Sequence, residues 1–205
     1  FKTINNSFED LGYYQAHEIL NAKFWVPQKR VRIFMVYFDK NIFSIEDIKK
    51  FQQELSALKT GNRKKVKEFS SIMEADPNKS FQIPQGTWDS LIRHRERHRS
   101  EGRGFGFNLL ENFSQPTNTL SARYAKDGAE ILIKQRYWRR PRKITLNEAK
   151  KLMGFNAKYA SLYGHAKSQG FPVDICSNTQ SYKQFGNAVV PHLIEEIANL
   201  IRKYI

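Results

Sequence analysis

The sequence predicts an α/β fold with a second, mixed α+β domain, and three observations carry that prediction. Residues 31–38 are nearly continuous apolar, as in a strand buried on both faces of a parallel sheet. Residues 45–58 and 193–204 repeat apolar side chains at the spacing of amphipathic helices. The long basic stretch between them is rich in turn signals, which indicates a mixed module rather than more of the same sheet.

The first element is a helix that begins at residue 1 without a capping residue before it. Its apolar positions recur at helical spacing: Phe1, Ile4, Phe8 and Leu11. Gly12 is suited to end it, because glycine takes the left-handed conformation of a helix C-terminus. A helix without its cap leads us to expect that the natural polypeptide, or a partner subunit, continues upstream. An expression boundary or a frayed start is the alternative.

Two strands are expected next, a weak one over residues 13–20 and the strong one over residues 31–38. Arg30 and Arg32 stand two positions apart at the entry to the second strand, so both side chains point to one face. Cations entering a buried strand suit an anionic ligand, because an unpaired buried charge is costly. An edge strand with solvated arginines is the other interpretation.

The middle of the chain is basic and turn-rich. Ser44 and Asp47 are close to a capping box for the helix over residues 45–58, and the lysine-rich residues 59–67 indicate a solvated loop or a phosphate-contacting arm. Thr87 is expected to cap another helix, whose inward residues are Trp88, Leu91 and Ile92. His94 and His98 have metal-binding spacing on that helix. They lack a third ligand and stand among cations, so no metal site is expected.

Beyond this helix, glycines at 102, 104 and 106 suit close backbone approach to a partner. Asp127-Gly128 predicts a hairpin between residues 117–124 and 130–133. A β-ribbon or its loops can enter the major groove of DNA, where arginine reads guanine with two hydrogen bonds. Residues 134–143 are basic with interleaved aromatics, which fits a groove lining or a plain surface loop.

The last elements are two helices. A capping box from Thr145 to Glu148 opens one that Gly154 ends. Pro191 suits the first turn of the other, and its apolar stripe runs to Tyr204; this helix could simply pack on a core. A helix start behind the Gly186-Asn187 interruption can also hold a carboxylate or phosphate.

Composition limits the class of protein. The chain has 34 basic and 20 acidic residues among 205, a net charge of +14, which favours a polyanionic partner. A single cysteine excludes an internal disulfide. No apolar run approaches the roughly 20 residues that a bilayer requires, and no secretory signal is present. We expect a soluble, cytoplasmic protein with no membrane partner that works near nucleic acid.

Residues 182–191, Tyr-Lys-Gln-Phe-Gly-Asn-Ala-Val-Val-Pro, resemble the closing motif of the DNA cytosine-5 methyltransferases. The resemblance implies that Asn187 and the Ala188 backbone help to hold S-adenosyl-L-methionine. Residues 26–32 are similar to the family's Gln-x-Arg-x-Arg block. By that match Arg30 and Arg32 face a flipped cytosine and the catalytic loop, Arg32 contacts the carbonyl oxygen of the base, and Gln28 holds the loop geometry.

Residues 93–99, 104–108 and 119–133 resemble the target-recognition region of bacterial methylases of the CCWGG type, which suggests a C- and G-rich duplex target. Thr119-Leu120 matches a pair that lies beside the extruded nucleotide. The candidate DNA-binding residues are Arg93, Arg97, Arg103, Thr119, Leu120 and Arg123. Residues 142–155 match the family's penultimate block, although Asn147 stands where relatives usually carry arginine.

The resemblance covers only the family's C-terminal part. The Gly-rich cofactor loop, the Pro-Cys nucleophile and the Glu-Asn-Val segment are missing, and Cys176 follows isoleucine, so we interpret it as non-catalytic. The resemblance implies the C-terminal portion of a doubly wound methyltransferase sheet plus a recognition domain. Residues 1–40 would belong to the catalytic domain, 41–172 to the recognition domain and 173–205 to the catalytic domain again.

We therefore expect a C-terminal segment or split subunit of a DNA cytosine-5 methyltransferase. Its partners would be double-stranded DNA and the N-terminal half of the enzyme, without which it would be inactive. The complete enzyme would flip the target base and methylate C5 through a covalent enzyme–base adduct, plausibly for restriction–modification. The alternatives are a non-catalytic DNA-binding module and a relative of the RNA cytosine-5 methyltransferases.

Overall fold

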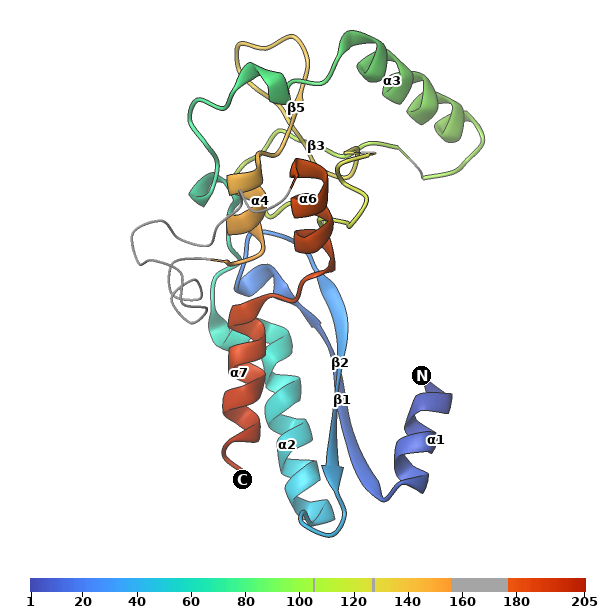
Figure 1. The fold of residues 1–205 in the computed structure, drawn as a ribbon, viewed down its shortest axis with the longest axis vertical. Helices are drawn as coiled ribbons and strands as arrows, with labels where there is room; N and C mark the ends of the chain where they lie inside the picture. Colours follow the sequence, from blue (N-terminus) through green and yellow to red (C-terminus); the bar gives the residue numbers. More distant parts are fainter. Residues whose placement is uncertain (105, 127, 156–176) are drawn as a thin grey trace.

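The computed structural model describes residues 1–104, 106–126, 128–155 and 177–205 and arranges them in two bodies, drawn one above the other in Figure 1. The lower body contains α1 (Lys2–Asp10), β1 (Tyr13–Asn21), β2 (Val31–Asp39), α2 (Ile45–Ala57) and α7 (Pro191–Ile201). The upper body contains α3 (Gln85–Ser100), β3 (Leu109–Leu110), β4 (Leu132–Ile133) and β5 (Arg142–Lys143). Between them lie α4 (Leu146–Leu152) and α6 (Asn178–Asn187).

Four short 3-10 turns connect these elements: η1 (Ala22–Phe24), η2 (Leu58–Arg63), η3 (Phe69–Ser71) and η4 (Lys79–Phe81). Cys176 lies outside the described residues, as do Asp127 and Phe105. Within the described ranges, no helix combines the length and the apolar composition that crossing a bilayer requires.

The strand expected over residues 31–38 exists, but its predicted setting in a parallel sheet is wrong. Strand β2 pairs antiparallel with β1 along its whole length, from Tyr13 opposite Asp39 to Asn21 opposite Val31. Residues 22–30 between the strands are too few for the crossover that parallel neighbours need. Among the described residues the sheet has only these two strands. Val31 and Ile33 are consequently 50% and 43% exposed.

The predicted helix ends at Gly12 and Ser44 are confirmed. Helix α1 is followed by Gly12, whose φ of +86° is the left-handed conformation that glycine adopts without strain. Helix α2 begins with a complete capping box, in which Ser44 and Asp47 exchange side-chain and backbone hydrogen bonds. Both ends follow from local chemistry that the sequence displays.

Helix α2 packs on β1 and α7, although it falls within the range predicted for the recognition domain. Near this packing, the Glu18 carboxylate is paired with Lys59 at 2.9 Å. Burial raises the pKa of Glu18, but hydrogen bonds from Lys59, Ser56 and the Ile19 N–H outweigh it, so the net pKa lies below its ordinary value.

Helix α3 begins two residues earlier than Thr87, the predicted cap. Pro84 occupies the N-cap with extended backbone, φ −60° and ψ 152°, and Thr87 lies inside the first turn. Proline has a fixed φ and no N–H, so it is well tolerated at a helix start. The inward face is confirmed: Trp88, Leu91 and Ile92 pack against a small buried cluster of Ile83, Phe107 and Leu132.

The hairpin predicted across residues 127 and 128 does not form. Strand β4 pairs parallel with β3 and antiparallel with β5, and residues 117–124 contribute only a single bridge, from Thr117 to Gln28. The reason is Tyr124, which is fully buried and whose hydroxyl donates to the Ile131 carbonyl at 2.7 Å. That bond joins Tyr124 directly to residue 131, and residues 122–126 form a turn where a strand was expected.

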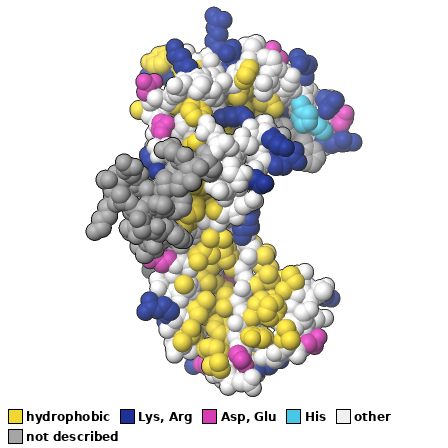
Figure 2. Space-filling view, viewed as in Figure 1, with side chains coloured by type: hydrophobic (Ala, Val, Ile, Leu, Met, Phe, Trp, Pro, Cys, Tyr) yellow, Lys and Arg dark blue, Asp and Glu magenta, His cyan; other side chains and the backbone are white. Residues whose placement is uncertain are grey.

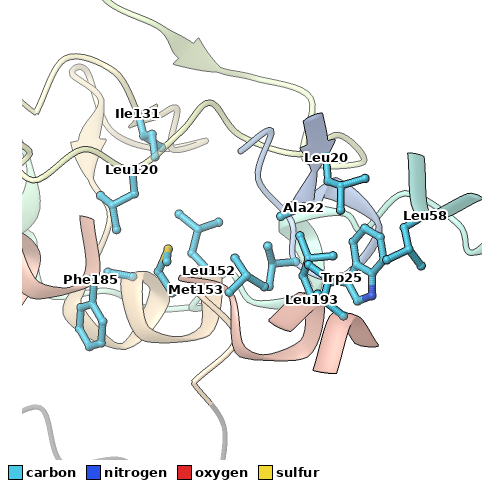
Figure 3. Close-up of a cluster of buried hydrophobic side chains, with 14 of the residues drawn as sticks. Leu20, Ala22, Trp25, Leu58, Leu120, Ile131, Leu152, Met153, Phe185 and Leu193 are labelled. Atoms are coloured by element: carbon cyan, nitrogen blue, oxygen red, sulfur yellow. The ribbon is translucent and has the colours of Figure 1, made fainter. Parts of the chain in front are cut away.

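One continuous hydrophobic core joins the two bodies. Figure 3 shows Leu152 and Met153 of α4 between side chains of the lower body, such as Leu20 and Trp25, and those of the upper body. The capping box of Thr145 and Glu148 and the left-handed Gly154, at φ +82°, bound this helix as predicted. The core therefore holds both bodies in a fixed relation to the surfaces described next.

Candidate functional site

A cavity of about 360 Å³ lies where the start of β2 faces the turn between α6 and α7. Four of the predicted site residues line it together: Arg30, Arg32, Asn187 and Ala188. Its apolar side includes Ile33, Val190 and Leu193. The chain thus brings the two ends of the sequence to one cavity, because β2 and α7 both pack into the lower body.

Arg30 is the buried member of this group, with only 5% of its surface exposed. Its guanidinium donates to the carbonyl of Leu120 at 3.1 Å and to those of Gly186 and Ala188 at 2.9 and 2.8 Å. Burial, together with the nearby charge of Arg32, lowers its pKa to about 10, so it stays charged at neutral pH. Arg30 therefore links residues 119–122, called the recognition segment below, and the closing motif to the start of β2.

Gln28 performs a similar task two residues earlier. It is fully buried, donates from Nε2 to the Leu152 carbonyl at 2.8 Å, and accepts at Oε1 from the Leu120 N–H at 3.0 Å. Lys29 joins the same arrangement, since its carbonyl accepts from the Thr119 hydroxyl at 2.6 Å. Residues 28–30 consequently fix the backbone of residues 119 and 120; the predicted catalytic roles of Gln28 and Arg30 remain predictions.

Arg32 differs from its buried neighbour. Its side chain is exposed, and its guanidinium donates to the Val31 carbonyl at 2.7 Å while lining the cavity. Most of its donors therefore face a space that a ligand can enter. Among the arginines of the cavity, this is the one placed to bind an acceptor that comes from outside the chain.

The two residues of the predicted pair, Thr119 and Leu120, differ in their exposure to solvent. Thr119 remains accessible beside Lys29, but the Leu120 side chain is fully buried in the core (Figure 3). Burial of an apolar side chain stabilises the fold. Hydrogen bonds with the side chains of Gln28 and Arg30 hold the Leu120 backbone in this position. The Leu120 side chain is therefore enclosed by the core in this structure, and its place beside an extruded nucleotide stays a prediction.

The closing motif adopts a conformation that the sequence did not predict. Gly186 lies inside α6 instead of interrupting it, and the helix runs on to Asn187. A Cβ at Gly186 would lie 2.3 Å from the Ser121 carbonyl carbon and 2.4 Å from the Ala122 nitrogen, so only glycine fits there. The lack of a side chain at Gly186 therefore lets α6 pack directly against the backbone of residues 121 and 122. Pro191 begins α7, as predicted.

Asn187 and Ala188, which the resemblance assigns to the cofactor, line the cavity side by side. Asn187 is exposed at the cavity, and in the described part of the chain its carboxamide has no hydrogen-bond partner. Val190 and Leu193 supply an apolar wall beside it. A free amide next to apolar side chains suits S-adenosylmethionine, which presents polar and apolar groups together. The residues present fit one wall of such a site.

The predicted DNA-binding arginines are exposed but do not form one cluster. Arg93 and Arg97 lie one turn apart on α3, and Arg123 lies in the turn near α6. Arg103 instead lines a second cleft together with Arg95 and Arg99. Neither Arg95 nor Arg99 was among the DNA-binding candidates predicted from the sequence. Their spacing of four residues on one helix was the available signal. Figure 2 shows Lys and Arg side chains along the upper body and down toward its junction with the lower one.

The two histidines of α3 lie next to each other on its surface. The Nε2 atoms of His94 and His98 lie 3.0 Å apart. Within the described ranges, no three groups of metal-binding type gather into a possible site.

Comparison with known proteins places these observations in a family. The profile of the C-5 cytosine-specific DNA methylases matches residues 1–203. The Type II methyltransferase M1.ScrFI of Lactococcus lactis subsp. cremoris is 38% identical over 97% of this chain and 46% of that protein. The DNA-cytosine methyltransferase of Escherichia coli (strain K12) is 31% identical over 98% of this chain and 45% of that protein.

Solved structures agree at the level of the fold. The Dnmt2 methyltransferase of S. pombe superimposes with a TM-score of 0.66 at 15% identity, covering 98% of this chain and 62% of that one. The Entamoeba histolytica methyltransferase EhMeth gives 0.57 at 18% identity, covering 100% and 57%. The chain spans about half the length of the curated relatives it matches.

Proposed function

This chain belongs to the family of C-5 cytosine-specific DNA methylases, and from that premise we propose that it supplies target recognition and one wall of the active site. The reaction would transfer a methyl group from S-adenosylmethionine to C5 of cytosine in duplex DNA. The main support for the proposal is that Arg30, Arg32, Asn187 and Ala188 line a single cavity. They come from distant parts of the chain: Arg30 is hydrogen-bonded to the carbonyl of Gly186, 156 positions away.

Arg32 is the residue that we assign to the base. Charge builds on the carbonyl oxygen of cytosine as C5 becomes nucleophilic, and a guanidinium at that oxygen stabilises the transition state more than the ground state. This assignment is supported by the exposed guanidinium of Arg32, which lines the cavity. Arg30, whose donors are engaged by three carbonyls, would act by holding the wall in place.

Asn187 and Ala188 are the residues that we assign to the cofactor: the amide and the backbone would bind its polar groups, and Leu193 lines the same cavity. The bound S-adenosylmethionine would supply the methyl group. The target cytosine must leave the helix to reach this cavity, because its C5 is otherwise stacked within the duplex. Thr119, fixed to the Lys29 carbonyl, would lie beside the vacated position.

The recognition role rests on the charge of the upper body. The whole chain has a net charge of +14, which gives a strong, salt-sensitive attraction to phosphates. We assign phosphate and base contacts to Arg93, Arg97, Arg103 and Arg123, and a C- and G-rich target of the CCWGG type. A restriction–modification role in the bacterial cytoplasm belongs to the same proposal, supported by the Type II methyltransferases among the relatives.

The missing chemistry would come from the N-terminal half of the enzyme, in the same polypeptide or as a partner subunit. Ile19 and Ile33 face each other across the sheet and are 56% and 43% exposed, with Val31 close by. Figure 2 shows hydrophobic side chains gathered over the lower body. Exposed aliphatic residues on a two-stranded sheet need a cover, and half of the length of the relatives remains to provide it.

The division at residues 1–40, 41–172 and 173–205 remains part of this proposal, with α2 as the element of the middle range that packs on the lower body. In the complete enzyme the doubly wound sheet would be continued by the N-terminal half.

The test is methyl transfer by this chain alone and by a chimera. The chimera joins the residues of the lactococcal relative that precede the matched region to this chain. With labelled S-adenosylmethionine and duplex DNA, we expect incorporation by the chimera and none by the 205-residue chain. Turnover by the chain alone would overturn the assignment of roles. A folded chimera that binds DNA without methylating it would favour a non-catalytic DNA-binding module.

A further inference from the structure

A second cleft, of about 420 Å³, lies in the upper body against the C-terminal half of α3. The residues that line it include Arg95, Arg99, Arg103, Asn108 and Asn118. The resemblance that located the candidate DNA contacts did not single out Arg95, Arg99 or either asparagine. The cleft is therefore a site whose ligand has to be deduced from its own chemistry.

Arg95 is held more firmly than an ordinary surface arginine. Its guanidinium carbon lies 4.1 Å from the centre of the Phe107 ring, and Phe107 is itself buried and packed on Trp88. Beside it, a Cβ at Gly106 would lie 2.8 Å from Cγ of Arg95, so the glycine makes room for the stem of the side chain. A guanidinium fixed on an aromatic face keeps its planar fork in one orientation.

The cleft favours a ligand that presents hydrogen-bond acceptors. Three guanidinium groups face it, and its one carboxylate, Glu130, already accepts a hydrogen bond from the Ser121 hydroxyl at 2.5 Å. In the described ranges, neither Arg95 nor Arg99 forms an ion pair, which leaves their donors available. The major-groove edge of guanine offers two acceptors, N7 and O6, at the spacing of a guanidinium fork.

The cleft also lies close to the site assigned to the target base. Asn118 lines this cleft. The next two residues are hydrogen-bonded to residues at or beside the first cavity: the Thr119 hydroxyl donates to the Lys29 carbonyl, and the Leu120 carbonyl accepts from Arg30. A duplex with its cytosine at Arg32 would therefore present neighbouring base pairs to α3. We infer that this cleft reads a guanine next to the target cytosine, with Arg95 as the specificity-determining residue. This inference rests on the proposed function.

The experiment selects bound sequences from a duplex library with a randomised central block, using the 205-residue chain and its variants. The wild type should enrich a motif that contains a fixed guanine. Arg95→Gln should lose about tenfold or more of the preference at that guanine and keep the preferences elsewhere. An unchanged motif in Arg95→Gln would overturn the inference. So would an equal loss for all sequences, which marks a phosphate contact, or a wild type that enriches no motif.

Two glycines provide a matched pair that leaves every arginine in place. Gly106→Ala should displace Arg95 and relax the same guanine, whereas a Cβ at Gly104 has nothing within 4 Å, so Gly104→Ala should select the wild-type motif. Arg202→Gln, at the far end of α7, controls for the loss of one charge. Equal behaviour of the two glycine variants would contradict the role of Arg95.

Methyl transfer by the wild-type chimera separates the two proposals. Transfer by the chimera together with an unchanged Arg95→Gln motif means that only the reading of guanine is wrong. Absence of transfer together with an Arg95-dependent guanine means that the proposed function is wrong, while the cleft still reads DNA.

Discussion

Replacement of Arg30 by alanine tests whether this side chain holds the candidate site together. The change removes the donor from the carbonyls of Leu120, Gly186 and Ala188, which its guanidinium reaches at 2.8 to 3.1 Å. These three acceptors belong to two segments that are distant in sequence, residue 120 in one and residues 186 and 188 in the other. Without Arg30, the recognition segment and the closing motif lose their shared attachment to β2.

The magnitude follows from the number of bonds and from the burial. Hydrogen bonds from a charged donor contribute about 1.5–3 kcal/mol each, so three give roughly 4–9 kcal/mol gross. Removing the guanidinium also removes the cost of burying it, which is several kcal/mol. We therefore expect Arg30→Ala to lower the free energy of unfolding by about 3–5 kcal/mol, the range seen when a buried charged contact is broken.

The assay is urea denaturation of the 205-residue chain, with Arg32→Ala as the matched control. Arg32 is exposed and donates only to its neighbour's carbonyl, so its loss should change stability by less than about 0.5 kcal/mol. Arg30→Lys keeps a charge but not the planar fork and should fall between the two. Equal stabilities of Arg30→Ala and Arg32→Ala would refute the role given to Arg30.

Three further predictions concern packing and charge. Gly186→Ala should destabilise the chain by about 2 kcal/mol or more, because its Cβ would overlap the backbone of residues 121 and 122; thermal unfolding measures this, and an unchanged Tm would contradict it. Glu148→Gln breaks a fully buried pair with Arg142 at 2.7 Å and should cost about 3–5 kcal/mol in urea denaturation, so a loss below about 1 kcal/mol would argue against the pair. The Glu18 carboxyl has a folded-state pKa below 4.5, so its stabilisation exists above that pH and disappears as the pH falls through the folded value. Stability curves of Glu18→Gln should therefore be flatter than those of the wild type between about pH 5 and pH 3, and parallel curves would exclude the effect.

Local chemistry was readable from the sequence. The capping boxes at Ser44 and Thr145 and the left-handed glycines at positions 12 and 154 bound their helices as predicted. Each of these features depends on residues within a few positions of one another. The N-cap of α3 was misplaced by three residues, because Pro84 rather than Thr87 occupies that position.

Long-range partners were not readable in the same way. The sequence shows an apolar run at residues 31–38, but the short connection to β1 decides that the pair is antiparallel. The two arginines of this region look alike in sequence, yet the carbonyls that bind Arg30 lie 90 to 158 positions away. Similarly, the contact between the Arg95 guanidinium and the Phe107 ring can be recognised only in the folded structure.

The proposed methyl-transfer site has the cavity of Arg32 and Asn187 as one of its walls. The most direct test measures methyl transfer and duplex affinity together in the chimera carrying Arg32→Ala. We predict a rate about 100- to 1,000-fold lower, as for the loss of a transition-state donor, with the affinity for duplex DNA within about threefold of the unmutated chimera. Equal losses of rate and affinity would show that Arg32 binds a phosphate and would contradict the proposal.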